Sequence, residues 1–297
     1  MTLAIFLTVL LLGILIGIPV AFSLLLSAMA LMLYMDIFSA DILAQALING
    51  VDSFPLLAIP FFMVAGEVMS HGGLAKRIVR LATALLGHRK GGLGYVVIFT
   101  SVLLAGLSGS AVADAAALSA MLFPMMAKAN YPQGRSAGLL ASGGIIAPVI
   151  PPSLPLILIG VAGNISIAKL FLAGIVPGLM MGAVLVMVWS FLVRNEDLET
   201  TPPASRAERW SAFRGAFFAL LLPVIIIGGI RFGVFTPTEA AVVAAVYAIT
   251  ISMLVYREVN LIGLYHLLVR SARSTAMVMF LVGCAMVAAW VITCHIP

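Results

Sequence analysis

The sequence predicts an all-α polytopic membrane protein, and three observations support this prediction. Of the 297 residues, 63% are hydrophobic and only 9% are charged, against about 25% in a soluble domain, so an ordinary soluble protein, a nucleic-acid binder and a disordered chain are excluded. Long apolar runs recur, as a bilayer-spanning chain requires. None of these runs alternates with period two, which argues against a β-barrel. The runs are 3–35, 53–70, 93–127, 137–162, 168–193, 215–233, 237–256 and 274–293.

The N-terminal run and the two cysteines predict neither a cleaved signal peptide nor a metal site. The N-terminal run has no basic n-region and no small-residue cleavage site, so we interpret it as a retained membrane segment rather than a signal peptide. The only cysteines, Cys284 and Cys294, lie in apolar surroundings and match neither a disulfide framework nor a metal spacing.

Two apolar runs are too long for one span. Gly17-Ile18-Pro19 interrupts the run 3–35, and because proline breaks a helix interior we predict two helices, 3–17 and 19–35. A single kinked helix is the alternative. The run 93–127 is interrupted near its middle by glycine and serine residues, from Gly106 to Ser110.

The placement of lysine and arginine predicts the sidedness of the chain. The connections that contain 14 of the 16 basic residues are 71–92, 128–136, 194–214 and 257–273. The connections 36–52, 163–167 and 234–236, with their margins, contain only Lys169 and Arg231. The first group is therefore expected on the cytoplasmic side.

This sidedness predicts a re-entrant hairpin over 93–127. The basic segments on both of its sides are cytoplasmic, yet two full crossings need about 40 residues plus a turn, and only 35 are available. The hairpin would turn at Leu107–Ser110. Non-helical backbone within a membrane must be buried in protein or line a wet cavity, so the turn is a candidate site.

The span 137–162 is predicted to be a broken helix. Pro148, Pro151, Pro152 and Pro155 remove backbone donors, so we expect a helix over 137–143, an irregular stretch, and a second half from about Ser153. Broken helices expose carbonyl groups and helix ends, which bind cations and anions.

Both stretches have a structural alternative as well. Glycine and serine often only allow membrane helices to pack closely. Asp114, in the return arm of the hairpin, is either a functional charge or a residue that stabilises the start of a helix. The Thr236-Pro237-Thr238-Glu239 segment favours a helix start.

The segments 3–70 and 215–293 have similar hydropathy. Each contains a pair of runs, split at Pro19 or Pro237, and then a third run; the first set begins outside and the second inside. Such an inverted repeat is typical of secondary transporters. The expected organisation is first-repeat scaffold helices 1–70, an amphipathic cytoplasmic interface helix 71–92, transport elements 93–162, a span and cytoplasmic loop 163–214, and a partial second repeat 215–297.

Five segments resemble the large membrane (permease) subunit of the tripartite ATP-independent periplasmic (TRAP) transporters. They are SFPLLAIPFFMVAGEVM (53–69), AGLSGSAVADAAALSA (105–120), IAPVIPPSLPLILIG (146–160), LFLAGIVPG (170–178) and FTPTEAAVVAAVYA (235–248). The resemblance implies a multi-pass protein of the bacterial inner membrane with an elevator mechanism. It implies sodium-driven import of organic acids such as sialic acid, C4-dicarboxylates or sugar acids, with Na⁺ as coupling ion, no other cofactor and no enzymatic activity. It also implies two protein partners, a periplasmic substrate-binding protein and a small membrane subunit, within the lipid bilayer.

The resemblance also implies the site residues. The sodium-binding residues would be Ser108, Gly109, Ser110, Gly144, Ala147, Val149 and Pro151. The substrate-binding residues would be Ser108, Asp114, Pro152 and Ser153. The family's large subunit continues through a second hairpin and a second sodium site, so we expect a C-terminally truncated chain that does not transport by itself.

Two alternatives remain open. One is another elevator carrier of the same superfamily that works without a binding protein. The other is an intramembrane serine protease, because Gly106-Leu107-Ser108-Gly109 resembles a rhomboid nucleophile motif. A serine nucleophile needs a base, and none of the four histidines, at positions 71, 88, 266 and 295, is expected at mid-membrane.

Overall fold

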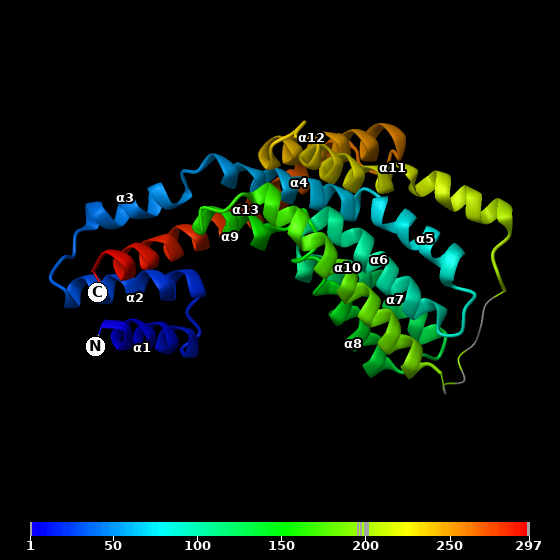
Figure 1. The fold of residues 1–297 in the computed structure, drawn as a ribbon, viewed down its shortest axis with the longest axis horizontal. Coiled ribbons are helices and arrows are strands. Elements are labelled where there is room, and N and C mark those ends of the chain that lie inside the picture. The colour runs from blue at the N-terminus through cyan, green and yellow to red at the C-terminus, as the bar shows by residue number, and fades with distance from the viewer. Residues whose placement is uncertain (1, 195, 197, 199–201, 296–297) are drawn as a thin grey trace. The chain divides into compact units, whose positions relative to one another are not determined.

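The computed structural model describes residues 2–194, 196, 198 and 202–295, and the side chains of all of these except residues 107, 108, 294 and 295. Thirteen α-helices, and no strand, occupy these residues (Figure 1). Six helical stretches of this part of the chain are long and apolar enough to cross a membrane. They are Phe54–His71, Ala111–Lys128, Ile167–Leu192, Arg206–Arg231, Pro237–Val255 and Leu261–Thr293. The predicted class of all-α polytopic membrane protein is confirmed.

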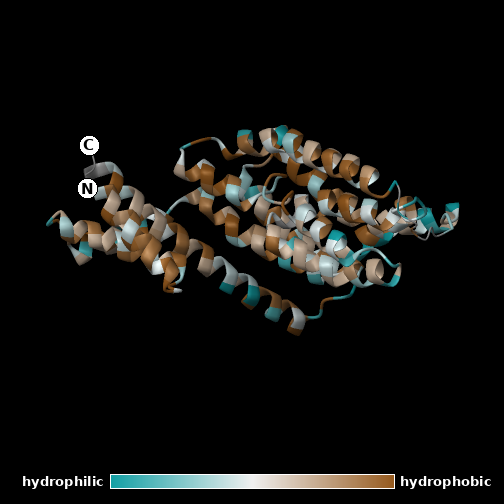
Figure 2. Cartoon of the chain, turned by 90° about the horizontal axis from the view of Figure 1, so that it is seen from below, coloured by the Kyte–Doolittle hydropathy of each residue, from teal (hydrophilic) through white to brown (hydrophobic). Residues whose placement is uncertain are grey.

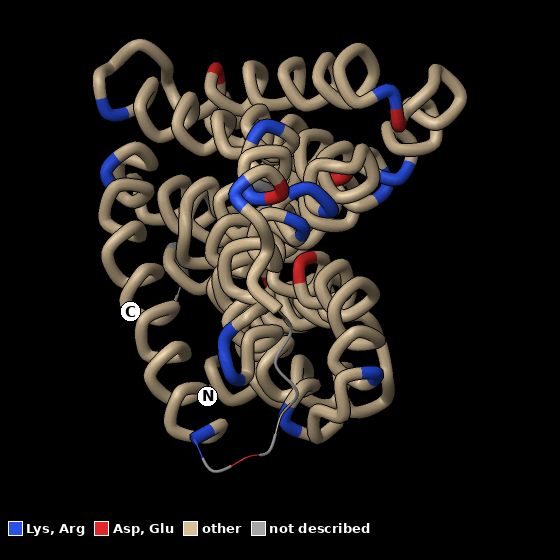
Figure 3. Tube along the Cα trace, turned by 90° about the vertical axis from the view of Figure 1, so that its right-hand side faces the viewer, with Lys and Arg blue, Asp and Glu red and all other residues tan. Residues whose placement is uncertain are grey.

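Apolar residues cover the helices on their outer faces as well as between them (Figure 2). Leu15, Phe191 and Val112 are each about 80% exposed, which a soluble protein would not tolerate in such numbers but a lipid-facing surface requires. Long stretches of the chain contain no charged residue (Figure 3).

The chain divides into two compact units, each described by itself: residues 1–56 with 272–297, and residues 57–271. The first unit contains α1 (Thr2–Leu15), α2 (Val20–Tyr34), α3 (Ala40–Val51) and the last part of α13 (Leu261–His295). Its core is built from apolar side chains of three helices: Phe6, Ala28, Leu31, Met32, Val287, Ala288 and Val291.

The run 3–35 forms two helices, not one kinked helix. Gly17 has a φ of +90°, which reverses the chain, and Pro19 precedes the first turn of α2. The two helices then pack closely, because a Cβ on Gly13 would lie 2.7 Å from the Ser23 hydroxyl oxygen.

The connections 36–52 and 257–273 are more helical than the sequence predicts. The first contains α3, which begins at the N-cap Ser39, and the second contains the start of α13. α3 has only 12 residues and includes Asp41, Gln45 and Asn49, so it lacks the long apolar run by which a span is recognised. In α13 the helix simply continues through Arg270 and Arg273, whose charges suggested a connection.

The second unit contains the helices on which the predicted site residues lie, together with the helices around them. They are α4 (Ala58–His71), α5 (Leu74–Leu86), α6 (Gly92–Ser108), α7 (Ala111–Lys128), α8 (Gln133–Gly144), α9 (Leu154–Ala162), α10 (Ile167–Leu192), α11 (Arg206–Arg231), α12 (Pro237–Thr250) and a π-helical extension (Ile251–Val255). As expected, α12 begins with a capping box, in which Thr236 accepts from the Glu239 amide at 3.3 Å and the Glu239 carboxylate accepts from the Thr236 amide at 2.8 Å.

The amphipathic helix α5 is tied to its neighbours through Arg77. Its apolar face packs on α11, with Leu81 against Ala212 and Ala216. The Arg77 guanidinium pairs with Glu258 and lies 3.7 Å from the ring centre of Tyr256. The Tyr256 hydroxyl donates to the Gly215 carbonyl at 2.8 Å. The Tyr256 side chain, which follows α12, therefore contacts both α5 and α11.

Replacing Arg77 by glutamine should lower the melting temperature of the protein in detergent. The change removes an ion pair whose side chains are less than one third exposed and a cation–π contact, together worth about 1–2 kcal/mol. Lys76→Gln is the matched control, because Lys76 is an exposed neighbour on the same helix. Equal melting temperatures for the two variants would show that the Arg77 contacts contribute nothing.

Candidate functional site

The first predicted stretch is the turn between α6 and α7. α6 ends at Ser108 and α7 begins at Ala111, so Gly109 and Ser110 form the whole connection. Gly109 has a φ of +62°, which L side chains rarely adopt. The Ser110 hydroxyl caps α7 by accepting from the Ala113 amide at 3.4 Å. The side chain of Ser108 lies outside the described part of the structure.

The second predicted stretch separates α8 from α9. Residues 145–153 form a series of tight turns in which the Ala147 amide donates to the Gly144 carbonyl at 3.2 Å and the Val149 amide to Ile146 at 3.0 Å. The Pro151–Pro152 bond is cis. Ser153 then caps α9, since its hydroxyl accepts from the Leu156 amide at 3.4 Å and donates to the Pro148 carbonyl.

The two stretches are in direct backbone contact. A Cβ added to Gly109 would lie 2.5 Å from the Pro152 carbonyl oxygen and 3.1 Å from the Ser153 Cα. A Cβ on Gly144 would lie 2.8 Å from the Ala115 Cβ and 2.9 Å from the Ala111 carbonyl oxygen. The turn of the hairpin therefore packs on the break between α8 and α9, and the end of α8 packs on the start of α7.

This contact contains carbonyl groups of the kind that a hard cation prefers. Within the described residues, no hydrogen bond reaches the carbonyl oxygens of Ala147, Val149 and Pro151. A buried carbonyl without a partner costs free energy, and Ala147 is only 1% exposed. The Val149 oxygen faces Gly174 and the Pro151 oxygen lies near Gly106, so the two point toward different helices.

The polar side chains of the predicted substrate site are buried. Asp114 is 2% exposed and lies in the first turn of α7, where the helix dipole favours a carboxylate. Ser153 is fully buried, and both of its hydroxyl interactions hold the break in shape. Pro152 is buried as well, at the contact with Gly109.

A row of glycines on α10 also belongs to this region, and it is not among the residues predicted from the sequence. A Cβ on Gly174 would lie 2.3 Å from the Val149 carbonyl oxygen, one on Gly178 2.2 Å from Ile150, and one on Gly182 2.8 Å from Val102. The spacing of four residues is the small-xxx-small pattern of closely packed membrane helices. This pattern is present in the sequence and indicates that α10 packs closely on a neighbour.

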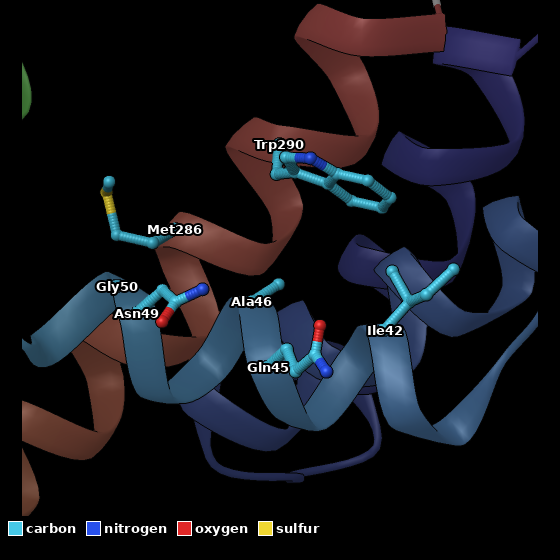
Figure 4. Close-up of a pocket in the computed structure, with 7 residues that line it drawn as sticks. All are labelled: Ile42, Gln45, Ala46, Asn49, Gly50, Met286 and Trp290. Carbon is cyan, nitrogen blue, oxygen red and sulfur yellow. The ribbon is translucent and has the colours of Figure 1, made fainter.

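Two cavities among the described residues lie away from this contact. In the first unit, a cavity of about 300 Å³ lies between α3 and α13, and its lining includes Gln45 and Asn49 of α3 and Met286 and Trp290 of α13 (Figure 4). In the second unit, a cavity of about 250 Å³ lies between α8 and α10, next to Arg135. Neither is lined by a predicted site residue. Pro151 lines a recess of about 10 Å³ together with residues of α10 and α11.

The chain matches one family model over nearly all of its length. The model is described as "Tripartite ATP-independent periplasmic transporter, DctM component" and matches residues 7–296.

Three relatives that are each named as a TRAP transporter large permease protein match at least 90% of the chain. The 2,3-diketo-L-gulonate TRAP transporter large permease protein YiaN of Escherichia coli K12 is 55% identical over 99% of this chain and 69% of its own length. The sialic acid TRAP transporter large permease protein SiaM of Vibrio cholerae is 41% identical over 93% and 65%. The C4-dicarboxylate TRAP transporter large permease protein DctM of Rhodobacter capsulatus is 36% identical over 90% and 64%.

These matches, together with the six helical stretches able to span a membrane, settle family and location. The protein is a multi-pass protein of the inner membrane, and its relatives are transporters rather than enzymes. The chain belongs to the TRAP transporters, as a member of their DctM, or large permease, component.

Proposed function

We propose that this chain is the permease subunit of a sodium-driven importer of organic acids. Its substrate would be delivered by a periplasmic binding protein, and a small membrane subunit would complete the membrane part. The relatives are named for 2,3-diketo-L-gulonate, sialic acid and C4-dicarboxylates, all of which are carboxylic acids. The 55% identity to the diketogulonate permease favours a sugar acid as the substrate.

The contact of Gly109 with Pro152 and Ser153 is the observation that best supports a coupled site. Na⁺ would be held by oxygens of both stretches: Ser108, Gly109, Ser110, Gly144, Ala147, Val149 and Pro151. A cation placed there would satisfy the Ala147 carbonyl, which accepts no hydrogen bond among the described residues, and would hold the hairpin turn and the break together. Sodium binding would therefore fix the shape of the substrate site next to it.

The substrate carboxylate would lie at the same contact. Its charge is stabilised by the bound Na⁺ and by the N-terminal ends of α7 and α9, which both begin here. We assign substrate contact to Ser108, Asp114, Pro152 and Ser153. Asp114 would repel a carboxylate in direct contact, so its role is to attract the cation beside the substrate. In the elevator mechanism, α6 to α9 would move together with substrate and Na⁺.

Uptake into proteoliposomes tests this function. The vesicles should contain a permease of the family's full length that includes this sequence, together with the small subunit, and the binding protein and a labelled sugar acid should be outside. We expect uptake under an inward Na⁺ gradient and none when K⁺ replaces Na⁺ or when the binding protein is omitted. Equal uptake with K⁺ would contradict sodium coupling, and uptake without the binding protein would favour a carrier that works alone.

A further inference from the structure

The first half of α11 has a cation followed by three aromatic residues on one face. Arg206, Trp210, Phe213 and Phe217 are spaced by four, three and four residues, which places them in one stripe of the helix. Trp210 is 62% exposed, Phe213 39% and Phe217 44%. Their rings form a ladder, with centroids 5.7 Å apart for the first pair and 6.3 Å for the second.

A second face of this helix packs against α5, and the two helices lie side by side (Figure 1). Arg209 lies one turn before the packed Ala212 and is partly buried. Its Nε atom is buried and has no hydrogen-bond partner among the described residues. A buried guanidinium N–H without an acceptor is costly, so an external acceptor at this position would stabilise the protein.

The charge around Arg209 is strongly positive. Arg206, Arg209 and Arg214 lie on α11, and within the described residues none of them pairs with a carboxylate. The one acidic residue within α5 and α11 is Glu208, whose carboxylate accepts from the Ser205 amide at 2.7 Å and interacts with Arg80 of α5. Four arginines, at positions 80, 206, 209 and 214, thus lie on these two helices with one carboxylate, which already caps its own helix.

The order of these groups along the helix matches the profile of a lipid leaflet. At 1.5 Å per residue, Trp210 lies about 6 Å, Phe213 about 10 Å and Phe217 about 16 Å beyond Arg206 along the axis. Cations at phosphate level, tryptophan at the interface and phenylalanine among acyl chains are the arrangement of interfacial anchors.

We propose that the α5–α11 pair binds the headgroup phosphate of an anionic phospholipid. Arg206 and Arg209 hold the phosphate, and Trp210 and Phe213 contact the acyl chains. A lipid is favoured over a protein partner because one molecule supplies both the anion and the apolar chains that the stripe needs. This site is separate from the hairpin turn and does not depend on the transport proposal.

Tryptophan quenching by brominated lipids tests the proposal. The chain has three tryptophans, of which Trp189 is 3% exposed and Trp290 lies in the other unit. In the variant Trp189→Phe/Trp290→Phe, fluorescence reports on Trp210 alone. Nanodiscs would contain a small fraction of brominated phosphatidylglycerol in plain phosphatidylcholine, or the reverse. We expect brominated phosphatidylglycerol to quench more strongly, with a preference of about fivefold for each arginine that contacts the phosphate.

The double variant Arg206→Gln/Arg209→Gln should abolish this preference. Arg231→Gln, at the far end of the same helix, is the matched control and should keep it. Equal quenching by the two brominated lipids would overturn headgroup recognition, and no quenching by either would show that a protein covers the stripe. Native mass spectrometry of the protein with all three tryptophans provides a second measurement. It should find phosphatidylglycerol retained by the parent protein and lost from the double variant, and equal retention would overturn the proposal.

Discussion

In a full-length permease that includes this sequence, replacing Gly109 by alanine is expected to reduce Na⁺-dependent uptake at least about tenfold. The new Cβ would lie 2.5 Å from the Pro152 carbonyl oxygen, so the hairpin turn must move away from the break. A side chain at a φ of +62° adds about 1–2 kcal/mol of backbone strain. Uptake into proteoliposomes and the melting temperature of the purified protein measure the two effects.

The variant Gly233→Ala is the control that distinguishes backbone strain at a positive φ from the close contact of a new Cβ with its neighbours. Gly233 has a φ of +71°, close to that of Gly109, but its Cβ would meet nothing within 4 Å. This variant should therefore lose some stability and keep its uptake. If Gly109→Ala transported as well as Gly233→Ala, the close approach of the turn to Pro152 would have no functional role.

Replacing Gly144 by alanine is expected to destabilise the protein and weaken sodium activation. Its Cβ would lie 2.8 Å from that of Ala115 and 2.9 Å from the Ala111 carbonyl oxygen, which forces α8 away from α7. Overpacking of this kind costs about 1–3 kcal/mol. Leucine at the same position should have a larger effect.

Gly138→Ala is the control within the same helix. Nothing lies within 4 Å of its added Cβ, and alanine is favoured over glycine in a helix by about 1 kcal/mol. The two substitutions should therefore change the melting temperature in opposite directions. A stabilising Gly144→Ala would show that α8 and α7 are not in close contact at this point.

The sequence predicts the class of the protein and the places where helices are interrupted. Gly109 interrupts a helix because glycine adopts a positive φ, and the prolines from Pro148 to Pro155 do so because they lack a backbone donor. Both causes lie in the residue types, so the sequence predicts these interruptions. The sequence does not predict the short helix α3, because polar residues interrupt its apolar residues. The structure shows that these apolar residues share one face, which packs on the core of the first unit.

Tertiary contacts are the part that the sequence does not predict. The contact between Gly109 and Pro152 joins residues more than 40 positions apart, and nothing local to either residue requires it. The sequence indicates close packing of α10 through a row of glycines, at positions 174, 178 and 182. Only the structure shows that their neighbours are Val149, Ile150 and Val102. The two hydroxyl interactions of Ser153 likewise depend on the folded turn.

The melting temperature of the purified chain in NaCl and in choline chloride, at equal ionic strength, tests the central claim most directly. A ligand that binds only the folded protein stabilises it by about 2.7 kcal/mol at a concentration of 100 times its dissociation constant. Saturating Na⁺ should therefore raise the melting temperature by several degrees. This increase should disappear in Gly109→Ala and persist in Gly233→Ala. Identical melting temperatures of the parent protein in the two salts would contradict a sodium site at the contact between the hairpin turn and the broken helix.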